Sequence, residues 1–411
     1  MPLTQFEQIQ SLLSQLTPGN RFYAAKLAGL GAVASLEEFS ARAPFTRKSE
    51  LIEDQQAHPP YGTNLTFPLA RYTRFTQTSA TTGKPMRWLD TPESWNWMLD
   101  CWQRVFEAAS VTAADRVFCA FSFGPFLGFW TAFEAASRMG CLAIPGGGMR
   151  SPARLAAMID TGATVLCATP TYAIHLAEVA AEEGIDLRAS CIRRIFVAGE
   201  PGGSILATRR RIESLWPGAQ VVDQHGMTEI GPVSYGCPAR PGILHVMEDK
   251  FLAEVIDPAS GAVVAPGNKG ELVLTNFGRA GSPLIRYRTG DLVEAEPPGA
   301  CACGTRDLSL AGGILGRADD MLVVRGVNVY PVAVEEIVRS CCAGEYRVWI
   351  SEERALVELS LEVEAPNGDR SLAHRIETAL RDALALRIPV SVVDPGTLPR
   401  FELKARRWVR R

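Results

Sequence analysis

The stretch from residue 71 to about residue 230 most limits how this chain can fold, because short apolar or β-branched runs alternate there with longer helical segments. The runs that we interpret as strands are Val117–Phe121, Ala163–Ala168, Arg194–Val197 and Gln220–Asp223. The helical segments are Glu93–Ala109, Pro125–Met139, Ser151–Asp160 and Tyr172–Glu183. Strands that alternate with helices predict a mostly parallel sheet covered by helices. Ligands of such sheets bind on the loops at the carboxyl ends of the strands.

The segments on either side of this stretch have other patterns. Residues 1–45 carry apolar residues at helical spacing, which predicts helices packed on the outside of a larger body. From 243 to 316, strand-like runs joined by Pro and Gly turns predict an antiparallel, barrel-like region. These runs are Phe251–Ile256, Gly270–Thr275 and Asp291–Ala295.

The part after Gly316 has the order β-α-β-β-α-β, which is typical of a small ferredoxin-like unit. Its expected elements are Met321–Val324, Val332–Cys341, Tyr346–Ser351, Ala355–Val363, Ser371–Leu384 and Val390–Val393. We therefore expect an α/β protein. A large N-terminal domain, residues 1–317, would combine mixed sheets covered by helices with the barrel-like region, and an α+β lid domain, residues 318–411, would move separately.

The composition of the 411 residues fits a globular protein with a sizeable core, with 47% hydrophobic and 21% charged residues. A net charge of −3 gives no reason to expect nucleic acid or an anionic membrane as partner. No apolar run approaches the roughly 18 residues of a membrane helix, and the start lacks the pattern of a signal peptide. We expect a cytoplasmic protein with reduced cysteines, and we leave a homodimer open.

The first chemical signal is a loop rich in hydroxyl residues that contains a Gly-Lys pair. Its members are Thr78, Ser79, Ala80, Thr81, Thr82, Gly83, Lys84 and Pro85. Hydroxyls and backbone amides donate hydrogen bonds to phosphate oxygens, and Lys84 adds a positive charge. The loop lacks the Gly-x4-Gly-Lys-Ser/Thr spacing of nucleotide kinases. The alternative interpretation is a surface Ser/Thr turn.

Four further signals follow in order. The run 224–229 ends in Glu229, which would hold Mg²⁺ on ATP just past a strand end; a helix N-terminus is the alternative. In Leu284–Leu292, Asp291 would accept hydrogen bonds from ribose hydroxyls, unless it is only a turn residue. The other two signals are Gly316–Pro331 and Leu398–Lys404.

The order of these five signals resembles the acyl-adenylate-forming superfamily of acyl-CoA ligases, carrier-protein-loading adenylation domains and luciferases. More narrowly, the chain resembles the phenylacetate–CoA ligase family from about residue 70 to its end. The narrower resemblance depends on the short length and on Gly199–Pro201, Ala253–Pro258, Leu284–Asp291 and Gly326–Pro331.

The resemblance implies a role for each matching position. The loop from Thr78 to Lys84 would bind the β- and γ-phosphates of ATP. The adenine site would be lined by Gly199, Glu200, Pro201, His225 and Gly226. Thr228 would contact the α-phosphate, and Glu229 would bind Mg²⁺. The ribose would be held by Asp291 and Arg317, the hinge would be Asp319, and the catalytic lysine would be Lys404.

The activity that the resemblance implies is ATP-dependent activation of a carboxylic acid to acyl-AMP, with release of pyrophosphate, followed by transfer to the thiol of coenzyme A. Two anions must meet, so a lysine and Mg²⁺ offset their repulsion while the site positions them. Two alternatives stay open. One is the loading of an aryl or amino acid onto the phosphopantetheine of a carrier protein in natural-product biosynthesis. The other is a degenerate nucleotide-binding protein without activity.

Four positions depart from the family pattern. Ala80 replaces a glycine of the phosphate loop, and alanine adopts positive φ less readily. His225 stands in place of a tyrosine and offers a smaller flat surface to adenine. Phe401 and Leu403 replace small residues beside Lys404, and this change is the feature that favours the alternative without activity.

A sulfur and imidazole set predicts a metal site. Cys237 and His245 are spaced Cys-x7-His, and Cys301 and Cys303 form a Cys-x-Cys-Gly turn. Two thiolates on a tight turn are typical of zinc sites, and four protein ligands would make the Zn²⁺ structural. The alternative is three ordinary cysteines and a surface histidine.

The resemblance implies an acyl pocket near the helix after the first long strand and beside the adenine loop. Its candidate residues are Phe121, Phe123, Gly124, Gly147 and Ala198. Phenylalanines beside glycines would make a flat apolar slot that suits an aromatic acid, either aryl or arylacetic. The alternative is that these phenylalanines are ordinary core residues.

Overall fold

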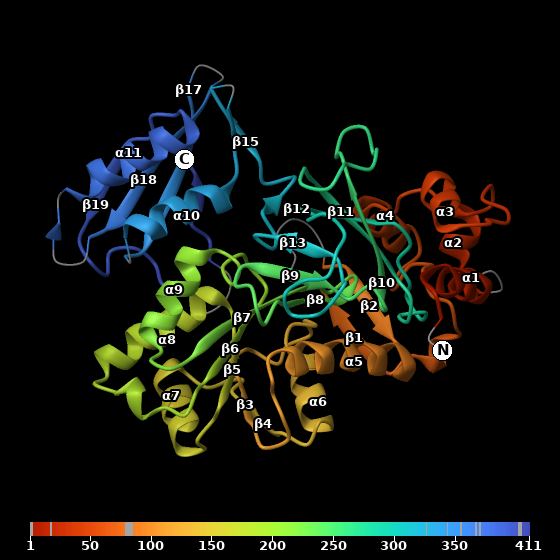
Figure 1. Ribbon diagram of the computed structural model, residues 1–411, viewed down its shortest axis with the longest axis horizontal. Coiled ribbons are helices and arrows are strands. Elements are labelled where there is room, and N and C mark those ends of the chain that lie inside the picture. Colours follow the sequence, from red (N-terminus) through yellow and green to blue (C-terminus); the bar gives the residue numbers. More distant parts are fainter. Residues whose placement is uncertain are drawn as a thin grey trace.

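The computed structural model describes residues 3–16, 19–78, 85–325, 327–342, 344–353, 356–365, 368–369, 371–401 and 405–411. At its centre is an eight-stranded sheet in the order β13-β9-β8-β7-β6-β5-β3-β4 (Figure 1). The strands are β3 (Arg116–Cys119), β4 (Leu142–Pro145), β5 (Val165–Ala168), β6 (Arg194–Val197), β7 (Gln220–Met227), β8 (Gly231–Gly236), β9 (Ile243–Val246) and β13 (Ser309–Ala311). From β4 to β7 the neighbours are parallel, as the alternating pattern predicts, and from β7 to β13 they are antiparallel.

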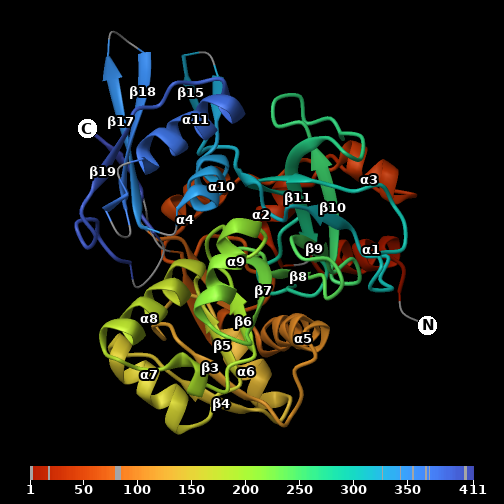
Figure 2. The ribbon, with the colours of Figure 1, turned by 60° about the vertical axis from the view of Figure 1, so that its left-hand side comes forward.

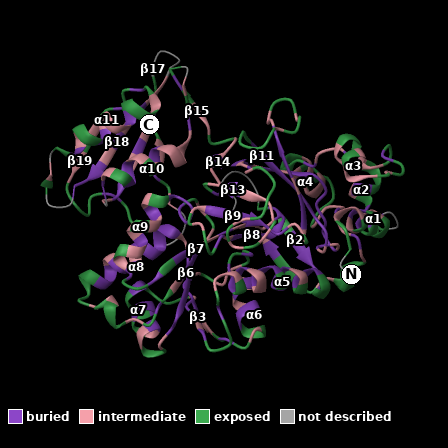
Figure 3. Ribbon diagram, in the orientation of Figure 1, coloured by how far each residue is buried: buried purple, intermediate pink, exposed green. Residues whose placement is uncertain are grey.

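Helices cover both faces of the parallel part. They are α5 (Pro92–Ala108), α6 (Trp130–Arg138), α7 (Ser151–Asp160), α8 (Pro170–Glu182) and α9 (Leu206–Leu215). Because strand side chains alternate between faces, Val117 and Cys119 join the core of α5 and α6 while Phe118 joins the core of α7–α9. In Figure 3 the strands of the sheet are mostly buried (purple) and the helices beside them are partly exposed, as expected for a sheet between two layers of helices.

An N-terminal group of helices packs on a second, antiparallel sheet. The helices are α1 (Gln5–Leu16), α2 (Arg21–Lys26), α3 (Leu36–Arg42) and α4 (Lys48–Ala57). The sheet has the order β10-β11-β12-β14, with β10 (Phe251–Ile256), β11 (Lys269–Asn276), β12 (Tyr287–Glu294) and β14 (Gly316–Arg317). Ile9, Leu12 and Phe39 share a core with Leu252 and Ile285. The expected outer helices and antiparallel region are therefore confirmed.

A hairpin of β1 (Arg74–Gln77) and β2 (Arg87–Asp90) lies between these parts, and 3-10 turns occur at Leu69–Arg71 and Leu187–Ala189. The helix expected from Pro125 begins only at Trp130, because Gly128 has a φ of 38° and residues 121–129 form a loop. In the described part of the chain, no helix is both long and apolar enough to cross a membrane.

The C-terminal unit lies at the opposite end of the molecule from α1–α3 (Figures 1 and 2). It contains α10 (Pro331–Cys341), β17 (Tyr346–Glu353), β18 (Leu356–Glu364), α11 (Leu372–Leu384), β19 (Val390–Val393) and β20 (Trp408–Arg410). Its sheet has the order β19-β18-β17-β20, and α10 packs on α9 of the large part. The expected large and small α/β parts are confirmed.

The sheet of this unit differs from the expected plan at one edge. The run expected as its first strand forms β15 (Leu322–Val324), which pairs only with β16 (Val327–Val329). The edge position beside β17 is taken instead by β20, which runs parallel to β17. Arg407, just before β20, is buried and paired with Glu345 and Glu335, which holds the end of the chain against the sheet.

Candidate active site and metal centre

The predicted site residues gather on loops at one edge of the parallel sheet. Phe121 follows β3, Gly147 follows β4, and Glu200 follows β6, so each comes directly after the carboxyl end of a parallel strand. His225 lies in β7, the last strand of the parallel set. Because carboxyl ends of parallel strands share one edge, segments far apart in sequence meet there (Figure 2).

Strand β7 changes partner within the predicted nucleotide motif. Up to Asp223 it pairs in parallel with β6, and from Gln224 it pairs with β8 in the antiparallel sense, with a register shift between His225 and Gly226. The strand expected to end at Asp223 therefore continues to Met227. Thr228 and Glu229 follow in the turn to β8. Irregular pairing of this kind is common beside active sites, because it redirects side chains.

His225, Asp291 and Arg317 form one connected group. His225 Nε2 lies 3.0 Å from Asp291 Oδ2, and Arg317 Nη1 donates to Asp291 Oδ1 at 3.2 Å. Arg317 stands opposite Asp291 across β12 and β14, and its Nε donates to Asp319 Oδ1 at 3.0 Å. Arg317 therefore contacts both Asp291, the other predicted ribose residue, and Asp319, the predicted hinge residue. Partial burial raises the pKa of Asp319, but the Arg317 guanidinium outweighs this and keeps it below the ordinary value.

Lys48 is a site residue that the sequence analysis missed. Its Nζ lies 2.8 Å from Glu229 Oε1, and the Glu229 side chain is only 7% exposed. Lys48 is the first residue of α4, in the N-terminal group of helices. No spacing in the sequence relates it to Glu229, because the contact joins two segments that are far apart in the chain.

Arg279 is a second residue that the sequence analysis missed. Its Nη1 donates to the carbonyl oxygens of Thr228, at 2.6 Å, and Glu229, at 3.0 Å. Its Nε and Nη2 donate to the two carboxylate oxygens of Asp90, at 2.6 Å and 2.7 Å, and both side chains are fully buried. The pair therefore holds the backbone of the turn on which Thr228 and Glu229 lie.

The predicted phosphate loop begins at the β1–β2 hairpin. Thr78 N donates to Met86 O at 2.9 Å, and Met86 N donates to Thr78 Oγ1 at 3.0 Å. These two bonds close the base of the loop. The rest of the loop, Ser79, Ala80, Thr81, Thr82, Gly83 and Lys84, lies outside the described residues, as do Gly326, Leu403 and Lys404. The roles of these residues stay predictions.

Glu200 turns its carboxylate toward the C-terminal unit. Its Oε1 accepts from Thr171 N at 2.8 Å, and its Oε2 accepts from Ala405 N at 2.8 Å. The adjacent Gly199 has a φ of 93°, which glycine adopts without strain. The adenine-lining roles of Gly199, Glu200, Pro201 and Gly226 stay predictions.

The predicted acyl-pocket residues lie in an aromatic cluster. The rings of Phe121 and Phe123 are 4.5 Å apart, and Phe123 meets Trp130 edge-on at 4.7 Å. A Cβ at Gly147 would come within 2.7 Å of the Phe123 ring, so only glycine fits there. Gly124 O accepts from Trp130 Nε1 at 3.0 Å, and Ala198 packs on the same core. The structure brings these five positions into one region.

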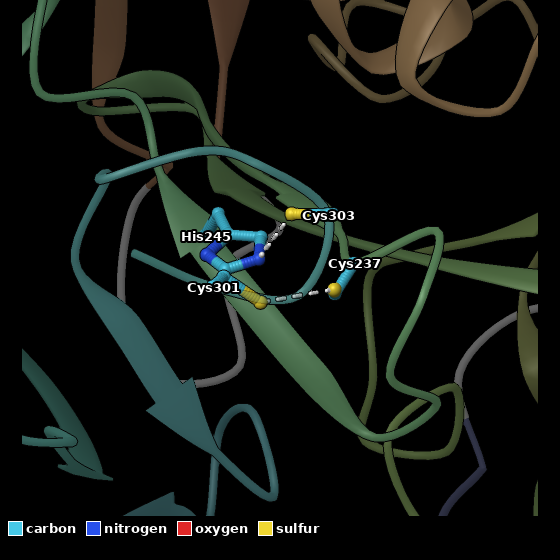
Figure 4. A group of neighbouring side chains, drawn as sticks. All are labelled: Cys237, His245, Cys301 and Cys303. Atoms are coloured by element: carbon cyan, nitrogen blue, oxygen red, sulfur yellow. Dashed lines mark hydrogen bonds between the residues drawn. The ribbon is translucent and has the colours of Figure 1, made fainter. Parts of the chain in front are cut away.

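The four predicted metal ligands converge from separate segments (Figure 4). Cys237 follows β8, His245 lies in β9, and Cys301 and Cys303 precede β13, which pairs with β9. Their ligand atoms all lie within 4.8 Å of one another. Cys237 Sγ is 3.6 Å from Cys301 Sγ, and Cys303 Sγ is 3.5 Å from His245 Nε2. Ligand atoms around tetrahedral Zn²⁺ are about 3.5–3.8 Å apart, so this set fits.

The pKa values of His245 and Cys301 suit a metal, whereas burial raises the pKa of Cys237 to about 11 and favours its thiol form in the absence of an ion. Burial lowers the pKa of His245, which favours the neutral imidazole that metals bind. Burial raises the pKa of Cys301, but hydrogen bonds from the Cys303 backbone and the neighbouring thiols outweigh it and bring the value to about 7. His245 Nδ1 lies 3.3 Å from Ser309 Oγ, a contact that orients the ring.

Comparison with known proteins connects this geometry to a family. The family described as "AMP-binding enzyme" matches residues 74–279, and "AMP-binding enzyme C-terminal domain" matches residues 326–411. Phenylacetate-coenzyme A ligase of Pseudomonas putida is 31% identical to the chain, covering 98% of it and 92% of that protein. The same ligase of Thermus thermophilus is 29% identical, covering 97% and 93%.

This chain belongs to the phenylacetate-coenzyme A ligase family of AMP-binding enzymes.

Solved structures of a related ligase also match this family member. 2-Hydroxyisobutyryl-CoA ligase in the postadenylation state, in complex with R3-HIB-AMP, matches with a TM-score of 0.92 at 29% identity, covering 99% of the chain and 89% of that ligase. The same ligase with 2-HIB-AMP and CoA in the thioesterification state matches with a TM-score of 0.74 at 30% identity, covering 99% and 88%. The phenylacetate-coenzyme A ligase family member therefore agrees better with the postadenylation arrangement.

The two family matches leave some of the site outside them. Lys48 precedes the first match, and Asp291, Cys301, Cys303 and Arg317 lie between the two. In this AMP-binding enzyme, the contacts of Glu229 with Lys48 and of His225 with Asp291 thus join residues within the first match to residues beyond it.

Proposed function

We propose that the chain converts an aromatic carboxylic acid, ATP and coenzyme A into an acyl-CoA through an acyl-AMP. In the first half-reaction the acid carboxylate attacks the α-phosphorus of ATP, and pyrophosphate leaves. In the second, the thiol of coenzyme A attacks the acyl carbonyl, and AMP leaves. The observation that carries the proposal is that one short segment makes both contacts: His225 at the end of β7 contacts Asp291, which pairs with Arg317, and Glu229 in the following turn pairs with Lys48.

Each group has a task in the first half-reaction. Thr228 contacts the α-phosphate and Asp291 holds the ribose. Glu229 would hold Mg²⁺, which neutralises phosphate charge when it is bound. Lys48 adds a cation beside Glu229, and Lys404 approaches the reacting atoms from the C-terminal segment. Since the substrate carboxylate is itself the nucleophile, the protein contributes positioning and charge rather than a covalent intermediate.

The aromatic cluster supports an aromatic acid as substrate. The tilted rings of Phe121 and Phe123 lie 4.5 Å apart near the carboxyl ends of β3 and β4, and Gly147 presents backbone to the Phe123 ring. Rings and bare backbone give the flat apolar wall that an aryl group fills. The phenylacetate-coenzyme A ligases among the relatives support the same choice.

Two further parts complete the proposal. Cys237, His245, Cys301 and Cys303 hold a structural Zn²⁺ that joins β8, β9 and the turn before β13. Residues 1–317 and 318–411 act as two units that turn about Asp319 between the half-reactions. The Arg317–Asp319 contact at the junction supports this division.

The test is ATP–pyrophosphate exchange with a panel of acids. We expect exchange with phenylacetate or benzoate derivatives and much less with an aliphatic acid such as 2-hydroxyisobutyrate. Thioester formation is then followed with coenzyme A and with a holo carrier protein as rival acceptors, and coenzyme A is expected to react. If no acid supports exchange, the proposed function is wrong; if only aliphatic acids do, the aromatic assignment alone is wrong.

A further inference from the structure

The segment around Lys404 is attached to the large part of the molecule by residues on both sides of it. On the N-terminal side, Arg400 Nε donates to Glu178 Oε2 of α8 at 3.1 Å. On the C-terminal side, Ala405 N donates to Glu200 Oε2 at 2.8 Å. Arg407 Nη2 lies 3.5 Å from Thr171 Oγ1, also in α8. Two of these three contacts use α8, and the remaining one uses Glu200 on the loop after β6.

Glu200 is built to make its contact. Its other oxygen, Oε1, accepts from the backbone N–H of Thr171, near the start of α8, at 2.8 Å. That N–H is one of the few at a helix start that have no partner inside the helix. The positive end of the helix also favours a carboxylate there. Thr171 therefore orients Glu200, and Oε2 is left to face Ala405.

The contact involves backbone rather than a flexible side chain. Arg400 contacts Glu178 through a long side chain, which also pairs with Glu364 within its own unit. The Ala405 N–H, in contrast, fixes the main chain at the residue that directly follows Lys404. A charge-assisted hydrogen bond to a backbone N–H is among the stronger polar contacts in proteins.

We propose that Glu200 is a positioning residue for adenylation: it holds the backbone at Ala405, the residue directly after Lys404, against the large part. This inference rests on the proposed function. The overall arrangement agrees with a postadenylation state, so the contact belongs to the first half-reaction. Thioester formation proceeds with the C-terminal unit placed otherwise, and does not use it. Glu200 therefore has a role in the adenylation step beyond the adenine contact that the family resemblance implies.

The experiment compares E200A and E200Q with the wild-type chain. E200A removes both acceptor oxygens. E200Q keeps one acceptor oxygen, but its amide nitrogen cannot accept the second N–H. The matched control is E182Q, because Glu182 is an exposed glutamate at the other end of α8. Three readouts are measured for each variant: ATP–pyrophosphate exchange, thioester formation from supplied acyl-AMP and coenzyme A, and amide hydrogen exchange of a peptide in which Ala405 is an internal residue, at the third position or later.

We expect E200A to lower pyrophosphate exchange by about 10- to 100-fold, the loss typical of a hydrogen bond to a charged group. At saturating acyl-AMP, kcat for thioester formation should stay within about 2-fold of wild type, because a lost adenine contact would raise KM for acyl-AMP rather than lower kcat. Amide exchange at Ala405 should become faster in E200A. E200Q should lie between E200A and wild type, and E182Q should match wild type in all three readouts.

Several results would overturn the inference. Equal losses in both half-reactions would mean that Glu200 only supports the fold, and unchanged pyrophosphate exchange would mean that it has no role in adenylation. Unchanged amide exchange at Ala405 in E200A would mean that the contact does not exist in solution. These outcomes differ from failure of the proposed function, in which the wild-type chain exchanges no pyrophosphate with any acid.

Discussion

Lys48 Nζ lies 2.8 Å from Glu229 Oε1, so a side chain from the first turn of α4 contacts the carboxylate that we propose as a ligand of Mg²⁺. The Lys48 side chain is 48% exposed, so it can reach an incoming triphosphate as well as Glu229. We expect Lys48→Met to lower kcat/KM for ATP in pyrophosphate exchange by about 10- to 100-fold, because one cation is lost beside the phosphates. The free energy of unfolding should also fall, by about 1–3 kcal/mol, because the buried Glu229 carboxylate loses its cation.

The matched control for Lys48 is Lys269→Met, because Lys269 is an exposed lysine at the start of β11. That variant should keep wild-type kinetics. If Lys48→Met also exchanges pyrophosphate at the wild-type rate, Lys48 only neutralises Glu229 in the free protein. In that case, urea denaturation of the variant without nucleotide is where any effect would appear.

The buried Asp90–Arg279 pair predicts a stability effect. Asp90→Asn would leave the fully buried Arg279 guanidinium without its carboxylate, and breaking a buried pair in this way costs about 3–5 kcal/mol. We expect urea denaturation to show a loss of that size, together with slower pyrophosphate exchange because the Thr228–Glu229 turn loses its support. A loss below about 1 kcal/mol would contradict the prediction and would mean that water or a neighbouring group compensates for the missing charge.

His225 supplies a kinetic prediction. Its imidazole contacts Asp291, so it orients the carboxylate that we propose to bind the ribose hydroxyls. His225→Phe keeps a flat ring but removes the contact, and we expect KM for ATP to rise several-fold with a smaller change in kcat. His225→Gln places an amide nitrogen near the position of Nε2 and should restore part of the affinity. A wild-type KM in His225→Phe together with a raised KM in His225→Gln would assign the effect to stacking on adenine rather than to Asp291.

The sequence predicted the parts of the site that are contiguous. The runs 224–229 and 284–292 carry their chemistry within a few residues, and the parallel sheet brings such loops to one edge. The convergence of the four candidate ligands could also be predicted, because two thiols on a tight turn are typical of zinc sites. Lys48 and Arg279 could not, since each acts through a contact with a distant residue and carries no local pattern.

The fold shows the same division. Arg194–Val197, Ser151–Asp160 and Phe251–Ile256 were predicted at their observed bounds, because periodicity and β-branched content decide local structure. The extension of β7 to Met227 and the addition of β20 depend on pairing with β8 and β17. Strand pairing is a long-range choice, and the local pattern of either segment does not contain it.

The metal centre gives the last prediction. Purified protein should contain about one zinc per chain, and removing it with a chelator should lower stability, because an ion that binds only the folded state contributes about 2.7 kcal/mol when its free concentration is 100 times its Kd. Cys301→Ser and Cys303→Ser should lose the metal and unfold at lower temperature, whereas Cys191→Ser, at an exposed cysteine outside the cluster, should behave as wild type.

Since the ligands lie on β9 and on the segments next to β8 and β13, and not on the nucleotide motif, the metal-free protein should keep its KM for ATP at low temperature. If the metal-free protein is as stable as the zinc-bound form, the proposal of a structural zinc site is wrong. A rise in KM for ATP on loss of zinc would show that the metal supports the nucleotide site through β7 and β8.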